Sequence, residues 1–213
     1  MEIISHRGLW NIKVEKNSLQ SFIDSFKKGF GTETDIRDLN GRLVISHDTP
    51  ILNSNLVYFE DFLEIYVKWA HKRPILALNI KSDGLNDLVK KQLNDYNIEN
   101  YFTFDMSVPD QLNYMKSNLK VFTRQSEFEN FPILYQQTLG IWLDSFHYNW
   151  YSTDLINEHF INDKLVCIVS SELHNRDKYE LWEFLKVSGL FKSEKLFLCT
   201  DFPEECINYF NRE

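Results

Sequence analysis

The chain has 213 residues and is short of cysteine, glycine and proline, with 3, 7 and 5 of them respectively. The cysteines, Cys167, Cys199 and Cys206, are odd in number and form no C-x-x-C pair. This pattern argues against a disulfide framework and predicts a reduced, cytoplasmic protein. No stretch rich in Gly, Ser or Pro separates parts of the chain, so we expect a single domain over residues 1–213.

Positive charge and long apolar runs are also scarce. The chain has 23 Lys and Arg against 31 Asp and Glu, a net charge of −8, which argues against a general nucleic-acid-binding protein. No apolar run reaches about 18 residues, so we expect no membrane insertion. The first apolar run breaks at Ser5-His6-Arg7 after the acidic Glu2, unlike a signal peptide. A hydrophobic content of 43% is still enough for a sizeable core.

Strand-like and helix-like segments alternate along the whole chain. The expected strands are residues 2–6, a hairpin over 31–48, then 74–81, 101–104, 119–123, 140–144, 164–169 and 195–199. The expected helices are one that starts at Asn17-Ser18 and stops before Gly29, then 59–72, 85–96, 108–117, a weaker one over 127–137, 152–160, 178–188 and 203–210. Eight such units predict a parallel sheet closed into a (β/α)8 TIM barrel of the α/β class. An open doubly wound sheet is the alternative.

The hairpin over residues 31–48 carries the first candidate site. Its Asn40-Gly41 pair is a strong two-residue turn signal, because both residues tolerate positive φ. Glu33 and Asp35 are two residues apart, so in a strand both carboxylates share one face. Two buried carboxylates need positive charge between them, and Mg²⁺ or Ca²⁺ prefers such oxygen ligands. The alternative is an exposed edge face without function.

Ionisable residues and one Asn gather where the predicted strands end. They are His6, Arg7, Glu33, Asp35, His47, Asn79, Lys81, Asp105, Arg124, Asp144, Glu172, His174 and Asp201. Active sites of parallel barrels lie at that end of the strands. Since Lys is rarely buried without a partner, an inward Lys81 is expected to pair with Glu33, Asp35 or a substrate phosphate. Asp105 and Asp201 each precede a predicted helix and are alternatively helix caps.

The later strand ends offer weaker candidates. Five of them are candidate pocket residues, namely Asp105, Arg124, Asp144, Glu172 and His174. His71 and His159 fall in predicted helices and are expected to be solvated. His147 lies in an aromatic run and is expected either to pack or to line a pocket.

These residues together resemble the glycerophosphodiester phosphodiesterases, which belong to the barrel superfamily that includes phosphatidylinositol-specific phospholipase C. The resemblance covers the first 50 residues densely, through His6-Arg7-Gly8, Asn17-Ser18, Glu33-x-Asp35, Asn40-Gly41 and His47-Asp48. Later support comes from Asn79-x-Lys81 and from Thr200-Asp201-Phe202-Pro203. The chain resembles a compact variant of the family, because it has no long insertion after His47-Asp48.

The resemblance implies a role for each matching residue. His6 and His47 would form the general acid/base pair, and Arg7 and Lys81 would hold the phosphate. Glu33, Asp35 and the residue at position 79 would bind a divalent metal, Mg²⁺ or Ca²⁺. The family has Glu at that last position, where this chain has Asn79. Its amide oxygen still ligates hard cations, but the site loses one negative charge.

The implied function is metal-dependent hydrolysis of a small glycerol-based or sugar-linked phosphodiester to an alcohol and a phosphomonoester. The residue types fit this chemistry, because a phosphodiester needs its charge neutralised and two His with pKa of about 6.5 suit proton transfer. A phospholipase D-like lyase that stops at a cyclic phosphate is one alternative. A non-catalytic phosphoester-binding barrel is the other.

Overall fold

The computed structural model describes residues 1–52 and 56–211, and these residues form two compact units. One unit spans residues 5–121, and the other joins residues 1–4 to residues from 122 onward. Across the described ranges, no helix is long and apolar enough to cross a membrane.

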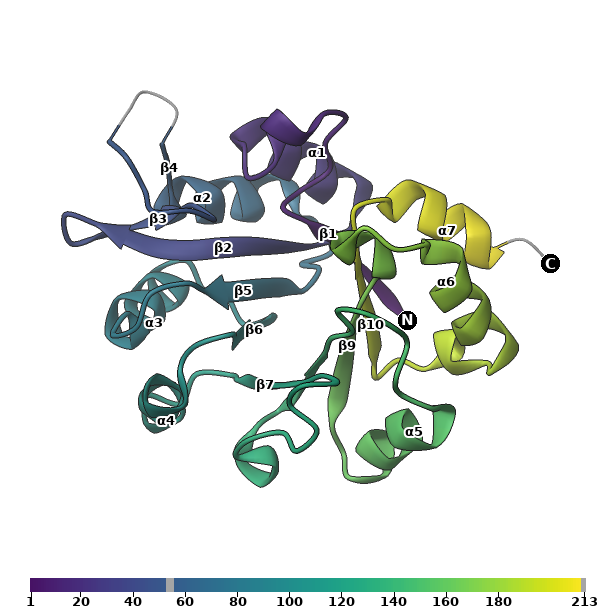
Figure 1. The fold of residues 1–213 in the computed structure, drawn as a ribbon. Helices are drawn as coiled ribbons and strands as arrows, with labels where there is room; N and C mark the ends of the chain where they lie inside the picture. Colours follow the sequence, from purple (N-terminus) through teal and green to yellow (C-terminus); the bar gives the residue numbers. More distant parts are fainter. Residues whose placement is uncertain (53–55, 212–213) are drawn as a thin grey trace. The chain divides into compact units, whose positions relative to one another are not determined.

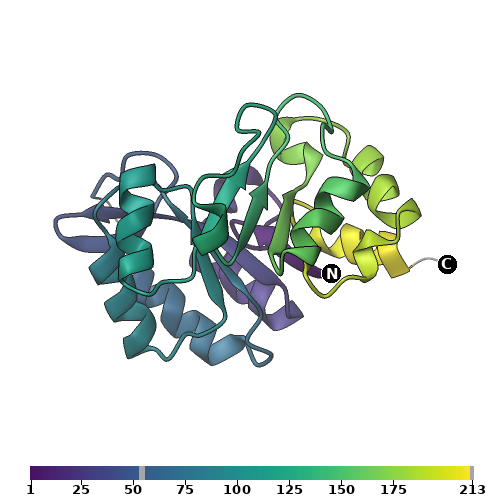
Figure 2. The same cartoon turned by 90° about the horizontal axis from the view of Figure 1, so that it is seen from below.

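The unit of residues 5–121 holds the predicted hairpin and the strands beside it. Strand β1 (Glu2–His6) enters it at Ser5. The other elements are η1 (Lys13–Glu15), α1 (Leu19–Lys28), β2 (Gly31–Leu39), β3 (Arg42–Ile45), β4 (Val57–Tyr58), α2 (Phe59–Trp69), β5 (Leu76–Ile80), α3 (Asn86–Asp95), β6 (Tyr101–Phe104) and α4 (Val108–Lys116). Strands β2, β5 and β6 pair in parallel, whereas β3 pairs antiparallel with the other edge of β2, and β4 with β3. Helices α3 and α4 lie side by side (Figures 1 and 2).

Local sequence signals explain the boundaries of these elements. Asn40 and Gly41 adopt φ of 52° and 78°, the left-handed pair of a primed hairpin turn. Ser18 caps α1 by accepting a hydrogen bond from the Ser21 amide, and Gly29 ends α1 at φ 81°. The predicted hairpin and first helix are therefore confirmed.

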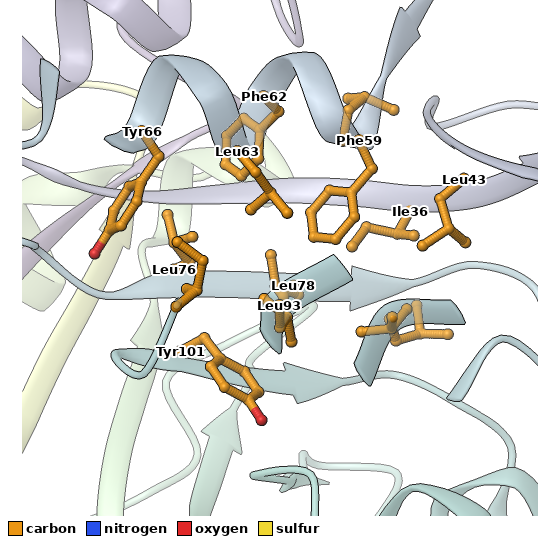
Figure 3. Close-up of a cluster of buried hydrophobic side chains, with 14 of the residues drawn as sticks. Ile36, Leu43, Phe59, Phe62, Leu63, Tyr66, Leu76, Leu78, Leu93 and Tyr101 are labelled. Carbon is orange, nitrogen blue, oxygen red and sulfur yellow. The ribbon is translucent and has the colours of Figure 1, made fainter. Parts of the chain in front are cut away.

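The core of this unit forms where α2 packs on the sheet. Figure 3 shows Phe59, Phe62, Leu63 and Tyr66 of α2 on the side of the sheet where β5 carries Leu76 and Leu78. All of these side chains are buried. This apolar layer fixes β2 and β5 next to each other, which aligns Asp35 with Asn79 in the parallel register.

The unit that contains residues 122–211 repeats the strand–helix alternation. Its elements are β7 (Phe122–Gln125), η2 (Tyr135–Gln137), β8 (Gly140–Leu143), α5 (Thr153–Ile161), β9 (Leu165–Val169), η3 (Ser171–His174), α6 (Lys178–Val187), η4 (Leu190–Lys192), β10 (Leu196–Thr200) and α7 (Pro203–Asn211). Strands β7, β8, β9 and β10 pair in parallel in chain order, with α5, α6 and α7 beside them (Figure 1). The three cysteines are buried and none of them forms a disulfide within the described residues.

The predicted helix over residues 127–137 is wrong. The Ser126 hydroxyl accepts hydrogen bonds from the amides of Phe128 and Glu129 and closes a turn there. Pro132 then follows, and Leu134 takes a left-handed φ of 55°, so only the short η2 forms. The strand before it also begins later than predicted, at Phe122 instead of Leu119.

Candidate functional site

The two carboxylates of the hairpin are buried side chains of one strand. Glu33 and Asp35 on β2 are 1% and 0% exposed, and Asn79 on β5 pairs with Asp35 in the register. The Asn79 amide donates to Glu33 Oε1 at 3.3 Å. The prediction that Glu33 and Asp35 share a face is confirmed by these contacts. The alternative of an exposed edge face is wrong, because both carboxylates are covered.

Two cations compensate the buried charge of Asp35. Arg7 Nε lies 2.8 Å from Asp35 Oδ2 as an ion pair, without the alignment of a hydrogen bond. Lys81 Nζ lies 3.6 Å from Asp35 Oδ1 and 3.7 Å from Asp105 Oδ2. The predicted anionic partner of Lys81 is therefore Asp35, and Asp105 joins the same cluster. Asp105 does not cap α4, because Ser107 accepts the capping hydrogen bond from the Asp110 amide.

A turn with left-handed backbone conformation places the Arg7 guanidinium beside the Asp35 carboxylate. Arg7 itself adopts φ 61°, and its amide donates to the Glu33 carbonyl at 3.0 Å. Gly8 follows at φ 89°, and a Cβ there would lie 2.5 Å from Ser21 Oγ. Only glycine fits that position, so Gly8 is a geometric requirement of this turn.

Asn17 belongs to a motif through which the sequence resembles the phosphodiesterases, but the sequence assigned it no role in the site. The pattern assigned Asn17-Ser18 to the start of a helix, and Ser18 does cap α1. The side-chain amide of Asn17 donates from Nδ2 to Asp35 Oδ2 at 3.0 Å, and its Oδ1 accepts from the Thr34 hydroxyl at 2.9 Å. This contact orients the Asp35 carboxylate from a distant segment, so no local pattern could have shown it.

The ion-pair contact found for Glu33 among the described residues is longer than those of Asp35. It joins Glu33 Oε2 to His6 Nε2 at 3.9 Å, and the His6 ring is charged only when it is protonated. Burial, followed by the Asp35 charge, raises the pKa of Glu33 to about 8, although Arg7 and Lys81 oppose the shift. At neutral pH Glu33 therefore holds a proton when nothing else neutralises it.

The oxygens around this cluster suit a hard cation. Three buried atoms, Glu33 Oε2, Asp35 Oδ1 and Asn79 Oδ1, have no hydrogen-bond partner among the described residues. Orphaned carboxylate and amide oxygens of this kind are the ligands that Mg²⁺ and Ca²⁺ prefer. Within residues 1–52 and 56–211, no group of three His, Cys, Asp or Glu could hold a metal. The donor set fits a divalent cation only if the Asn79 amide counts as the third ligand.

The two candidate proton carriers differ in their surroundings. His6 is mostly buried, and Lys16 Nζ lies 3.5 Å from its Nδ1. The His47 side chain is 50% exposed and its Nδ1 lies 2.8 Å from Asp48 Oδ1. The backbone before it is fixed to the site, because the Ser46 amide donates to the Asp35 carbonyl at 3.0 Å. The pairing of His6 and His47 as general acid and base, which the resemblance implies, stays a prediction.

The later candidates belong to the unit that contains residues 122–211. His174 Nε2 lies 2.7 Å from Oδ1 of the buried Asp144, which also accepts from the Ser145 amide at 2.8 Å. Glu172 accepts from the Thr200 hydroxyl and, at 3.0 Å, from the Asp201 amide. Arg124 Nε lies 3.7 Å from Glu129 Oε2. Asp144 and His174 thus form an acid–imidazole pair, whereas Glu172 ties the end of β10 to η3.

The prediction that His159 is solvated is wrong. Its ring is buried on α5, with Nε2 2.8 Å from Gln125 Oε1 and Nδ1 2.9 Å from the Tyr135 hydroxyl. Burial lowers the pKa of His159, which fits a neutral core histidine. This network lines a pocket of about 360 Å³ together with Phe131 and Glu158. The other uncertain histidines are exposed: His71 lies past the end of α2, and His147 packs edge-on to Phe128.

Solved structures of glycerophosphodiester phosphodiesterases share this fold. A putative glycerophosphoryl diester phosphodiesterase from Silicibacter pomeroyi matches with a TM-score of 0.77 and 11% identity, over 99% of this chain and 93% of that one. An Oleispira antarctica phosphodiesterase, solved with the product sn-glycerol-3-phosphate, matches with a TM-score of 0.69 and 14% identity, over 100% and 97%. These likenesses confirm the predicted (β/α)8 barrel and confirm the family resemblance at the level of the fold.

More distant chemistry occurs on the same fold. A Ca²⁺-dependent phosphatidylinositol-specific phospholipase C from Streptomyces antibioticus matches with a TM-score of 0.61 and 11% identity, over 99% of this chain and 96% of that one. A family 18 chitinase from Pseudoalteromonas aurantia matches with a TM-score of 0.58 and 8% identity, over 99% and 98%. No protein-family model matches the chain, and no curated protein matches it. Function therefore has to be argued from the site, not from the fold.

We predict that the Glu33→Gln variant flattens the pH dependence of stability in metal-free protein. The folded pKa of Glu33, about 8, exceeds its ordinary value of 4.5. The contribution of Glu33 to stability is therefore complete below about pH 4.5 and is lost as pH rises through 8. Urea unfolding at pH 5.5 and 8.5 in chelator should show a smaller difference in Glu33→Gln than in wild type. The exposed Glu180→Gln is the control, and equal slopes in all three proteins would refute the assignment.

Proposed function

We propose that this protein is a metal-dependent phosphodiesterase that hydrolyses a small glycerol-based or sugar-linked phosphodiester. The observation that carries the proposal is the set of orphaned oxygens on Glu33, Asp35 and Asn79, flanked by Arg7 and Lys81. Such a cluster offers a cation site beside two partly exposed, positively charged side chains that an anion can also contact. Its members are the residues through which the sequence resembles the phosphodiesterases, and the fold agrees.

Charge neutralisation is the first task of the site. Arg7 and Lys81 are each placed beside Asp35, and both side chains keep some exposure, 18% and 21%. Because they are partly exposed, both side chains can donate hydrogen bonds to the non-bridging oxygens of a phosphate where they stand. Glu33, Asp35 and Asn79 would hold a divalent cation, which supplies Lewis-acid charge for the phosphate when bound.

Proton transfer is the second task, and His6 and His47 are proposed to share it. One His takes the proton from the attacking oxygen as a new phosphorus–oxygen bond forms. The other gives a proton to the leaving alkoxide as the old ester bond breaks. In a glycerol-based substrate the neighbouring hydroxyl can attack first, after which water opens the cyclic phosphate. If water does not enter, the protein is a lyase and the cyclic product accumulates.

The substrate class is proposed from chemistry and from one neighbour. The Oleispira antarctica phosphodiesterase binds sn-glycerol-3-phosphate, which is the phosphomonoester expected from a glycerophosphodiester. We further propose a cytoplasmic location and a single domain over residues 1–213, which the buried thiols and the continuous alternation of elements support. A non-catalytic phosphoester-binding barrel is the second candidate function, favoured by Asn79 in place of an acid.

The proposed function is tested by a screen of phosphodiesters with Mg²⁺, Ca²⁺ or Mn²⁺ and after exhaustive chelation. We expect turnover of a glycerophosphodiester that chelation abolishes and added metal restores, because Glu33 and Asp35 need a counter-charge. Product analysis separates hydrolysis from the lyase reaction by the presence of cyclic phosphate. Binding of phosphoesters without turnover would favour the non-catalytic barrel, and full activity after chelation would contradict the metal assignment.

Replacing His6 or His47 with Ala should lower kcat by about 10²–10⁴, which is the usual contribution of general acid/base catalysis. The exposed His71→Ala is the matched control and should keep wild-type kcat, because His71 lies past the end of α2. Steady-state kinetics on the best substrate measures all three variants. A loss smaller than about threefold at His6 or His47 would remove that residue from the mechanism.

The Asn79→Glu variant should bind the metal more tightly than wild type, because hard-cation sites gain affinity with ligand charge. Activity need not rise with it, since a new carboxylate two residues from Lys81 can compete with the phosphate for that amine. Calorimetric titration with Mg²⁺ and Ca²⁺ measures the affinity, and Asn79→Ala serves as the matched loss of a ligand. Equal affinity in all three proteins would show that Asn79 does not contact the cation.

A further inference from the structure

Arg37 stands on the same strand face as the two site carboxylates, and no pattern in the sequence singled it out. It follows Asp35 by two residues on β2, just as Asp35 follows Glu33. No ion pair between its guanidinium and these carboxylates is found in the part of the chain that the structure describes. The guanidinium donates from Nε and Nη2 to the His47 carbonyl at 3.1 and 3.0 Å, and from Nη1 to the Lys81 carbonyl at 3.0 Å.

The two carbonyls lie on the segments that leave the two neighbours of β2. His47 follows β3, which flanks one edge of β2, and Lys81 follows β5, which flanks the other. A guanidinium is a flat, rigid fork, so three hydrogen bonds from it fix both segments relative to one plane. Arg37 thus bridges the main chain of a candidate proton carrier and that of a candidate phosphate ligand.

The His47 segment depends on this bridge more than the Lys81 segment does. The Lys81 amide continues the sheet ladder by donating to the Ile36 carbonyl at 2.9 Å. On the other side, the last backbone hydrogen bond to β2 found among the described residues is that of the Ser46 amide, and the His47 ring bonds to Asp48, which belongs to the same segment. Beyond it the chain is exposed, with Ile51 and Leu52 at 72% and 68%. The two hydrogen bonds from the Arg37 guanidinium to the His47 carbonyl therefore hold this segment to β2.

We propose that Arg37 is a positioning residue that holds His47 and Lys81 in the arrangement needed to act on one phosphate. The inference rests on the proposed function. Arg37 acts through two neutral carbonyls and leaves the substrate to the residues it positions. Loss of the hydrogen bonds from Arg37 to the His47 carbonyl reduces kcat, and loss of the hydrogen bond to the Lys81 carbonyl raises KM.

A double-mutant cycle tests this proposal. Arg37→Ala should lower kcat by about 10- to 100-fold, the order expected when a catalytic group moves by roughly 1 Å. In the His47→Ala background the same change should alter kcat by less than about threefold while KM still rises, because the positioned group is already gone. A merely structural Arg37 would lower kcat by the same factor in both backgrounds, and that result would overturn the proposal.

Two further variants separate the clamp from charge and from general destabilisation. Arg37→Lys keeps the positive charge, but an ammonium group cannot donate to both carbonyls as the planar guanidinium does. Its kcat should therefore fall nearly as far as that of Arg37→Ala. Arg42→Ala is the matched control on the same hairpin, because Arg42 is exposed. The contacts found for its guanidinium in the described residues are with Glu60 and Tyr58, away from the site carboxylates. Arg42→Ala should keep wild-type kinetics. Wild-type kinetics in Arg37→Ala would refute the positioning role.

Hydrogen exchange gives a readout that needs no activity. In Arg37→Ala the amides of residues 46–48 and 81–83 should exchange faster than in wild type, while those of α2 and β6 keep their protection. Unchanged exchange in both segments would contradict the clamp. If wild-type protein shows no turnover, the proposed function fails, and this exchange experiment alone decides whether Arg37 holds the two segments.

Discussion

Burial of Glu33 and Asp35 on one face of β2 is the constraint on which the rest of the site depends. Removing an ionised carboxylate from water costs several kcal/mol unless charge and hydrogen bonds compensate it. For Asp35, Arg7 and Lys81 supply the positive charge and Asn17 donates to Oδ2, while Oδ1 has no hydrogen-bond partner among the described residues. For Glu33 the charge is compensated less well, so its pKa rises to about 8, and its Oε2 also has no hydrogen-bond partner among the described residues. A divalent cation is the partner that this asymmetry favours.

The surrounding backbone is shaped to meet that constraint. Arg7 and Asp105 both adopt left-handed φ, of 61° and 74°, which non-glycine residues take only when their surroundings hold them there. In each case the conformation sets a charged side chain in the cluster around Asp35 and Lys81. Backbone strain, ion pairing and the pKa of Glu33 are therefore parts of one arrangement, and weakening one of them weakens the others.

The sequence was informative where the signal is local and silent where a partner is distant. The Asn40-Gly41 turn, the Ser18 cap and the spacing of Glu33 and Asp35 are each set within a few residues, and all were predicted. Asn17 and Arg37 act on groups that the fold brings to them, so their roles needed the structure. The same reason explains the errors: Tyr135 and Gln125 turn the helical His159 into a buried residue, and Ser126 converts a weak helical pattern into a turn.

Direct observation of a cation among the orphaned oxygens tests the central claim. Crystals soaked in Ca²⁺ and measured at a long wavelength would give an anomalous difference map of the site. We expect a peak at about 2.3–2.6 Å from Glu33 Oε2, Asp35 Oδ1 and Asn79 Oδ1. A map with no peak there at saturating Ca²⁺, or with the ion bound away from Glu33 and Asp35, would contradict it.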